Sequence, residues 1–281
     1  MNAMAEIHQF NHAAMATHFQ VRIAGEEREY SAQAAQAAFD LVDAFESRLS
    51  RFRIASDIAR TNALQPGEKM RLSEPAFACL EIAKRMEDAT RSAFCATPAA
   101  LKSQTSLPQW SLEREDHSIV CMSGRLEFDL GAIGKGFALD RVAELLNHWE
   151  CPSFLLIAGG SSILAGDAPP EAPGWSCGLG ENNAPQRFFL THASLSGSGL
   201  AVKGAHILDP RSGQSAWREK RAWVLADTAA ESDALSTACM VLTESELEQV
   251  LAQNDSWLAF LDTGDGIQAV GRRPIPKQAE G

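Results

Sequence analysis

Residues 125–149 change from the hydrophobic period of a strand to that of a helix. Apolar and acidic side chains alternate over residues 126–130, which predicts a half-buried strand. From position 138 onward the apolar residues recur at helical spacing: Ala138, Val142, Leu145, Leu146 and Trp149. Three glycines, Gly131, Gly134 and Gly136, flank Lys135 between the two segments. A helix that opens on such a turn exposes N–H groups, so the turn is a candidate cradle for phosphate, with the lysine adding a positive charge. It matches neither standard glycine-rich nucleotide motif, and a tight turn without a ligand is the alternative.

The same patterns predict helices and strands on both sides of this unit. Helices are expected over residues 31–49, 73–90 and 231–242, and a capping box of Thr243 and Glu246 starts another that ends near residue 254. Short strands are expected at residues 19–23, 153–157, 175–179, 187–190, 193–196, 206–208, 222–225, 257–261 and 267–270. Residues 50–62 are polar and are expected to be irregular. Runs of strands separated by pairs of helices are typical of an α+β protein.

Composition narrows the classes of function. A net charge of −11 argues against broad binding to nucleic acid or to anionic membranes. The six cysteines are scattered without a C-x-x-C pair, so free thiols in a reducing compartment are expected rather than a zinc site or a disulfide framework. The first 25 residues contain no apolar run long enough for a signal peptide, and no apolar stretch reaches about 18 residues. We therefore expect a cytoplasmic protein without membrane insertion.

Two further stretches carry side chains suited to chemistry. Asp233 and Thr237 are four residues apart on a predicted helix and share a face, which suits a hard cation such as Mg²⁺. An exposed polar face is the alternative, although apolar neighbours indicate burial. His206 lies on a predicted strand that runs into a D-P-R-S-G turn. Histidine is the obvious general base at neutral pH, and a structural histidine is the alternative.

Seven short blocks along the chain resemble the ApbE family of flavin transferases (FAD:protein FMN transferases), in the family's order. The blocks are M-A-T-H-F (15–19), S-D-I-A-R-T-N (56–62), A-F-C-A-T-P (93–98), F-D-L-G-A-I-G-K-G-F-A-L-D (128–140), A-G-G (158–160), H-I-L-D-P-R-S-G (206–213) and S-D-A-L-S-T-A (232–238). The resemblance implies an α+β, ApbE-like fold with a T-fold-like core, a smaller α/β subdomain and mixed, mainly antiparallel sheets. It also implies one transferase domain of two intimately packed subdomains over residues 15–270, an N-terminal arm over 1–14 and a C-terminal tail over 271–281.

The resemblance further implies Mg²⁺-dependent transfer of FMN from FAD to a threonine or serine hydroxyl of a target flavoprotein, with release of AMP. The residues that match the family's FAD contacts are Met15, Phe52, Ala93, Phe94, Cys95, Asp129, Lys135 and Ile207. The metal would be held by the backbone carbonyl of Ala132 with Asp233 and Thr237. His206 matches the histidine that deprotonates the acceptor hydroxyl.

This chain departs from the family's pattern at four places. Cys95 replaces an aspartate, Phe52 a tyrosine, Leu195 a threonine and Ser161 an aspartate. Because the same metal and phosphate groups would serve with water as the acceptor, a FAD pyrophosphatase that yields FMN and AMP stays open as an alternative. A protein that binds FAD without turning it over is the second alternative.

Overall fold

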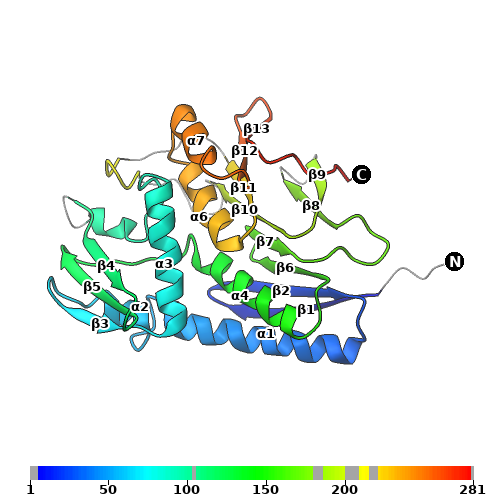
Figure 1. Ribbon diagram of the computed structural model, residues 1–281, viewed down its shortest axis with the longest axis horizontal. Coiled ribbons are helices and arrows are strands. Elements are labelled where there is room, and N and C mark those ends of the chain that lie inside the picture. The colour runs from blue at the N-terminus through cyan, green and yellow to red at the C-terminus, as the bar shows by residue number, and fades with distance from the viewer. Residues whose placement is uncertain (1–5, 103–105, 180–185, 200–208, 215–220, 280–281) are drawn as a thin grey trace.

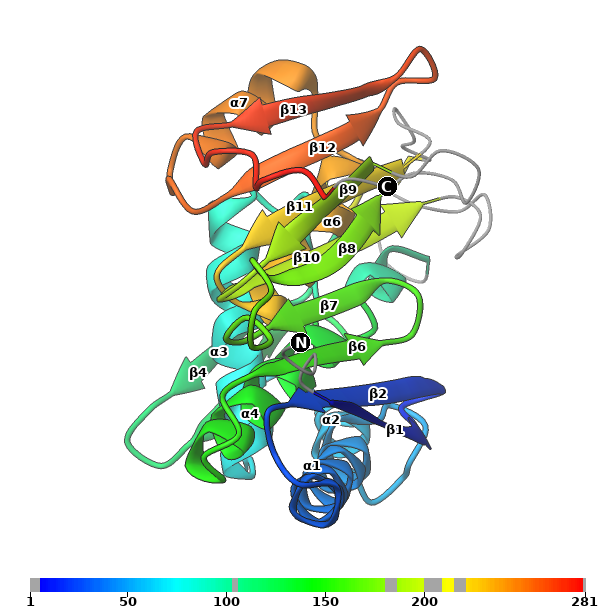
Figure 2. The same ribbon diagram turned by 90° about the vertical axis from the view of Figure 1, so that its right-hand side faces the viewer.

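An eight-stranded sheet forms the centre of the computed structural model, which describes residues 6–102, 106–179, 186–199, 209–214 and 221–279. Its strands are β1 (Ile7–Ala14), β2 (Thr17–Ala24), β6 (Phe154–Ala158), β7 (Ser162–Ala165), β10 (Ala193–Gly199), β11 (Arg221–Ala226), β12 (Leu258–Asp262) and β13 (Ile267–Gly271). The strands lie side by side in the same order in which they follow one another along the chain (Figures 1 and 2). Every pairing in the sheet is antiparallel.

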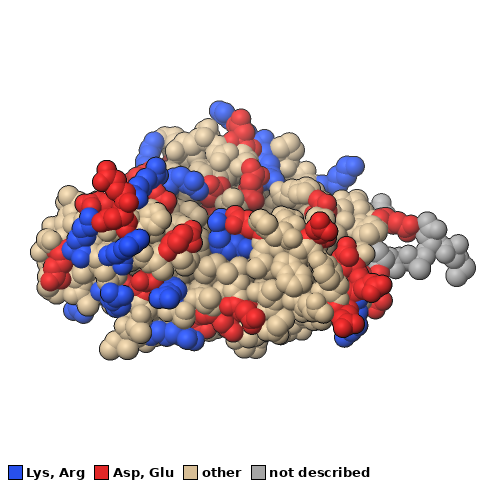
Figure 3. Space-filling model, turned by 60° about the horizontal axis from the view of Figure 1, so that its bottom comes forward, with Lys and Arg blue, Asp and Glu red and all other residues tan. Residues whose placement is uncertain are grey.

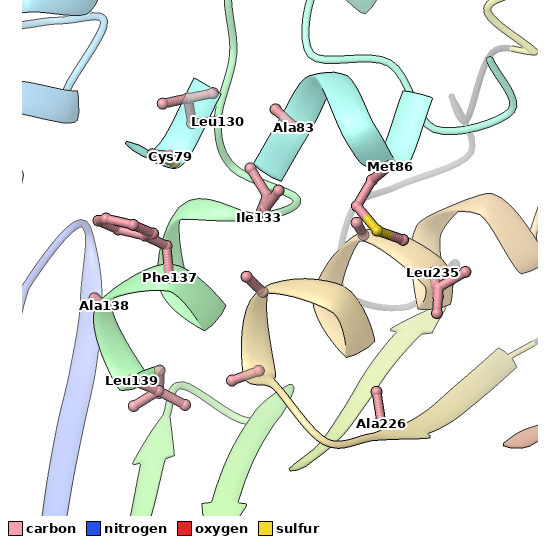
Figure 4. Close-up of a cluster of buried hydrophobic side chains, with 14 of the residues drawn as sticks. Cys79, Ala83, Met86, Leu130, Ile133, Phe137, Ala138, Leu139, Ala226 and Leu235 are labelled. Carbon is pink, nitrogen blue, oxygen red and sulfur yellow. The ribbon is translucent and has the colours of Figure 1, made fainter. Parts of the chain in front are cut away.

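Helices cover one face of this sheet. They are α1 (Arg28–Leu49), α2 (Asp57–Thr61), α3 (Glu74–Ala89), α4 (Gly134–His148), α6 (Ala229–Cys239) and α7 (Glu244–Leu251), with a short 3₁₀ turn, η1 (Pro98–Lys102). Helix α4 packs against β6 and β7, and α6 packs against β10 and β11. Helices α3, α4 and α6 meet in a shared apolar layer, in which Ile133 points toward α3 and Met86 of α3 points toward α6 (Figure 4).

Two smaller sheets complete the architecture. One contains β3 (Lys69–Arg71), β5 (Ser118–Ser123) and β4 (Gln109–Glu113), and it lies beside α3 at one end of the molecule (Figure 1). The other is the hairpin of β8 (Trp175–Leu179) and β9 (Gln186–Leu190), which covers the large sheet on the face away from the helices. Because side chains alternate across a strand, β11 turns Val224 toward the helices and Leu225 toward the hairpin. The central strands of the sheet are therefore apolar and covered on both faces, whereas the edge strands β1 and β13 expose part of their side chains.

The surface mixes both signs of charge. On the face drawn in Figure 3, basic and acidic side chains are interspersed toward the left-hand end, and acidic side chains predominate toward the right-hand end. No helix among the described residues is both long enough and apolar enough to cross a membrane.

The structure confirms the α+β class and most of the elements expected from the pattern of residues. The helix expected at residues 73–90 is α3, with Ser73 and Thr90 as its caps, and the capping box of Thr243 and Glu246 starts α7. The helix expected at 231–242 begins at Ala229 and ends at Cys239. The strand expected at 206–208 lies outside the described residues.

Three segments differ from their sequence predictions. Residues 7–14, expected to belong to a loose arm, form the edge strand β1. Residues 50–62, expected to be irregular, contain α2, whose first turn is capped by Ser56. Residues 126–130 alternate buried and half-buried side chains as predicted, but they are not a strand. Their backbone bonds instead to the Asn62 side chain and to the carbonyl of Ala96, so alternate burial here does not reflect strand pairing.

Candidate functional site

A cavity of about 280 Å³ opens where four segments of the chain meet. They are the β1–β2 turn, the end of α1 with the loop after it, the turn before α4, and the first turn of α4. The lining residues are Met15, Ala16, Thr17, Glu46, Leu49, Ser50, Arg51, Phe52, Asp129, Leu130, Gly131 and Lys135. Four of the residues predicted to contact FAD, namely Met15, Phe52, Asp129 and Lys135, are thus brought together from distant parts of the sequence.

The turn between β1 and β2 is strained where it borders this cavity. Met15 and Ala16 have φ angles of 51° and 57°, in the left-handed region that glycine or asparagine usually fills in two-residue hairpin turns. Neither residue is glycine, so the antiparallel pairing of β1 with β2 holds them there at a cost in conformational energy. The Met15 side chain lies at the cavity wall.

The loop after α1 presents an aromatic ring to the cavity. Phe52 is 82% exposed although it lines the wall, and the guanidinium of Arg51 lies 4.6 Å from the centre of its ring. Arg51 also lies 3.5 Å from the carboxylate of Asp129, which lines the same cavity. An exposed aromatic face beside a cationic group suits the stacking of a planar, electron-poor ring.

Lys135 connects this cavity to the polar face of α6. Its ammonium donates to the carbonyl of Gly131 at 3.0 Å and lies 3.4 Å from the Asp233 carboxylate. The same carboxylate accepts from the amide of Gly136 at 3.3 Å. Part of the anion cradle predicted at the start of α4 is therefore directed at a carboxylate of the protein.

Hydroxyl groups from two strands of the large sheet surround Asp233 and Thr237. Ser162 on β7 donates to Asp233 at 3.0 Å, and the Ser198 hydroxyl on β10 lies 3.3 Å from that of Thr237. The sequence did not predict that these serines lie beside Asp233 and Thr237. The signal was present in Ser194, Ser196 and Ser198, since serines at alternate positions of a strand share a face.

The donor set around Asp233 fits magnesium. Among the described residues, no group of three histidine, cysteine, aspartate or glutamate side chains is arranged to hold a metal ion. Asp233 supplies one carboxylate, while Thr237 and Ser162 supply hydroxyls, and Ala132 lies in the turn before α4. All of these donors are oxygens, which Mg²⁺ prefers, and this ion commonly takes its other ligands from water and phosphate.

The loop that carries Ala93, Phe94 and Cys95 lies apart from the 280 Å³ cavity. The first two residues are buried in the core, Phe94 with only 1% of its surface exposed. Cys95 lines a different cavity, of about 420 Å³, together with Glu87 and Trp110. Burial, with a smaller effect of the Glu87 carboxylate, raises the pKa of Cys95 to about 11. Cys95 is therefore a neutral thiol at physiological pH and does not supply a negative charge.

This loop is nevertheless bonded to the cavity wall, because the amide of Asp129 donates to the carbonyl of Ala96 at 2.8 Å. His206 and Ile207, the predicted base and the remaining predicted FAD contact, lie outside the described residues.

Comparison with known proteins gives a consistent match. The model of the ApbE family matches residues 15–261. A FAD:protein FMN transferase of Chlamydia muridarum is 26% identical over 242 residues, which are 74% of this chain and 74% of that protein. One of Klebsiella pneumoniae is 24% identical over 214 residues, 64% of this chain and 66% of that protein.

Solved structures share the fold at low sequence identity. The flavin transferase ApbE from Vibrio cholerae has a TM-score of 0.81 at 18% identity, and the match covers 94% of this chain and 96% of that chain. The apo form of the Pseudomonas stutzeri flavinyl transferase ApbE has a TM-score of 0.81 at 20% identity and covers 96% of each chain.

Proposed function

The chain belongs to the ApbE family, and from this premise we propose that it transfers FMN from FAD to a threonine or serine hydroxyl of a target flavoprotein, with release of AMP. One observation carries the proposal. Lys135 lines the cavity that contains Phe52 and also pairs with Asp233, so the proposed flavin site and the proposed metal site share one ammonium.

The cavity can divide the substrate between an apolar part and a charged part. We propose that Phe52 and Met15 contact the flavin ring, since both line the cavity wall and the Phe52 ring is exposed. Lys135 is proposed to contact the pyrophosphate, because its ammonium is the cationic group nearest to the polar face of α6 among the interactions described above.

The proposed reaction breaks one bond of the pyrophosphate and forms one phosphoester bond. The acceptor oxygen attacks the phosphorus of the FMN half, the bond to the bridging oxygen breaks, and AMP leaves with the electron pair. The hydroxyl proton passes to a base, for which His206 is proposed from the sequence. Mg²⁺, when bound by Asp233, Thr237 and the carbonyl of Ala132, would neutralise charge that develops on the phosphates.

The test measures both products. Purified protein is incubated with FAD and Mg²⁺, with and without EDTA. The mixture also contains a purified acceptor flavoprotein whose FMN-carrying threonine is still unmodified. Metal-dependent AMP together with covalent flavin on the acceptor would support transfer. AMP with free FMN and an unmodified acceptor would instead indicate a FAD pyrophosphatase. Bound FAD without AMP in the presence of acceptor would contradict the proposal.

A substitution separates the metal site from general damage. We expect Asp233→Ala to abolish AMP release at limiting Mg²⁺, because it removes the carboxylate that is proposed to hold the metal and that faces Lys135. Asp255→Asn serves as the control, since Asp255 is exposed and pairs with Arg272. Equal loss in both variants, or undiminished AMP release by Asp233→Ala, would overturn the assignment.

A further inference from the structure

A carboxylate on α4 caps the beginning of α6. Asp140 accepts from the amide of Ala229 through Oδ1 at 2.6 Å and from the amide of Ala230 through Oδ2 at 2.9 Å. These are the first two residues of α6, whose early amides have no partner within the helix. The side chain of the local N-cap, Thr228, accepts from the amide of Glu231 at 3.3 Å. The first turn of α6 is therefore attached to α4 as well as to its own cap.

The same two helices also meet one turn earlier on α4, where Gly136 lies against Ala229 and Ala230 of α6. The Gly136 backbone lies so close to α6 that a Cβ atom there would be 2.1 Å from the Ala229 carbonyl oxygen. Beyond this point, the Asp233 carboxylate faces Lys135 at 3.4 Å and the amide of Gly136 at 3.3 Å. A shift of α6 along α4 would change all of these separations together.

The capping carboxylate is kept in place despite a cost. Burial raises the pKa of Asp140 to about 7, while its two backbone hydrogen bonds act in the opposite direction. Two parallel acceptors matched to two amides need a carboxylate, because an asparagine offers a single acceptor oxygen. A neutral side chain with one acceptor oxygen would be enough if only one amide of α6 needed a hydrogen-bond partner.

We propose that Asp140 is a positioning residue, which fixes the register of α6 against α4 so that Asp233 meets Lys135 at the distance the metal and phosphate groups require. The inference rests on the proposed function, since it assigns Asp140 to the same reaction. It adds a residue that touches neither FAD nor the metal ligands but sets the spacing between them. Residues that orient metal ligands in this way commonly affect metal affinity or activity by about tenfold or more.

The test compares two ways of weakening the cap of α6. Asp140→Ala removes the bonds to α4, whereas Thr228→Ala removes the local cap and leaves α4 untouched. All proteins are assayed at pH 8, above the pKa of about 7 that burial gives Asp140. Three quantities are measured: the Kd for FAD from flavin fluorescence, the Mg²⁺ concentration that gives half of the Mg²⁺-induced rise in Tm with FAD bound, and the rate of AMP release.

For Asp140→Ala we expect the Mg²⁺ requirement to rise and AMP release to fall, each by about tenfold, with the Kd for FAD changed less than about threefold. Thr228→Ala is expected to lower Tm without either change. Asp140→Asn, which keeps one acceptor, is expected to lie between wild type and Asp140→Ala, and it carries the test if the alanine variant does not fold. If Asp140→Ala (or Asp140→Asn in its place) lowers Tm but leaves the Mg²⁺ requirement at the wild-type value, Asp140 is a structural cap and the inference is overturned. A wild-type protein that neither responds to Mg²⁺ nor releases AMP would overturn the proposed function, and the inference with it.

Discussion

Position 136 accepts glycine alone because of the contact between α4 and α6. A Cβ atom built there would lie 2.1 Å from the carbonyl oxygen of Ala229, 2.4 Å from its carbonyl carbon and 2.7 Å from the nitrogen of Ala230. These atoms are backbone, so no change of side-chain rotamer relieves the overlap. To bring the nearest atom from 2.1 Å to the 3.0 Å below which Cβ contacts essentially never occur, the helices must separate by about 1 Å.

The expected cost of Gly136→Ala follows from this separation. Overpacking of a buried contact costs about 1–3 kcal/mol, and weakening the two bonds from Asp140 to α6 adds about 1 kcal/mol each. The higher helix propensity of alanine returns about 1 kcal/mol. The net loss is about 3 kcal/mol, which corresponds to a fall in Tm of about 6–12 °C for a protein of this size.

Catalysis should suffer more than folding does. Because Lys135 lies on α4 and Asp233 lies on α6, their 3.4 Å contact lengthens when the two helices separate. A displacement of about 1 Å in a reacting group can lower a rate by about 100-fold. We therefore expect Gly136→Ala to release AMP from FAD at least about tenfold more slowly than wild type at temperatures where it is folded.

Urea unfolding followed by circular dichroism checks the stability, and Gly134→Ala is the matched control. Gly134 lies in the same helical turn, but a Cβ there would meet its nearest neighbours, Leu130 and Met15, at an ordinary 3.5 Å. This control should unfold within about 1 kcal/mol of wild type. If Gly136→Ala were as stable as Gly134→Ala, the close approach of α4 to α6 would not exist in solution and the reasoning would fail.

Three further outcomes are expected. Phe52→Ala should weaken FAD binding by about tenfold, because it removes an aromatic stacking face. Ile54→Ala is the control and should leave binding unchanged, since Ile54 is 91% exposed and does not line the cavity. Equal Kd values for the two variants in a fluorescence titration would refute the stacking role. His206→Ala should keep FAD affinity and slow transfer to the acceptor by about 100-fold or more, and an unchanged rate would assign the base elsewhere. The pKa of Glu246 is lowered from 4.5 to about 2. The backbone amide of Thr243 has the largest effect, and the Arg211 guanidinium and the Thr243 hydroxyl add to it. A carboxyl whose pKa is lowered in the folded state stabilises the fold above pH 4.5, and this stabilisation is lost as the pH falls toward 2. The difference in free energy of unfolding between wild type and Glu246→Gln should therefore shrink from pH 4.5 to pH 2. A difference that did not change with pH would contradict the interpretation.

Local signals in the sequence predicted the elements whose cause is local. Thr243 and Glu246 form a capping box because the two residues are three apart, and no other part of the chain is needed. Residues 126–130 show where such reasoning stops. Their alternation correctly predicted alternate burial, but the partners of the backbone, Asn62 and Ala96, are set by the tertiary fold.

The candidate site was predicted in parts and not as an arrangement. Lys135 and Asp233 were each singled out, yet 98 positions separate them and no local pattern reports that they meet. Asp140 appeared in a matching block without a role, because a carboxylate that caps another helix looks like any acidic residue of an amphipathic helix. Ser162 was missed for the same reason, since its partner is 71 positions away.

The order of strands in the large sheet has a consequence for how this protein can change. Neighbours in the sheet are also successive strands of the sheet along the chain, so the sheet is a meander. We call a long segment that connects two neighbouring strands, and that carries helices, an excursion. Met15 lies at a turn of the meander, Phe52 and Lys135 lie in the excursion between β2 and β6, and Asp233 lies in the one between β11 and β12. Lengthening an excursion costs little closure entropy and leaves the strand pairing intact. Binding preferences can therefore diverge by replacement of excursions while the sheet is inherited unchanged.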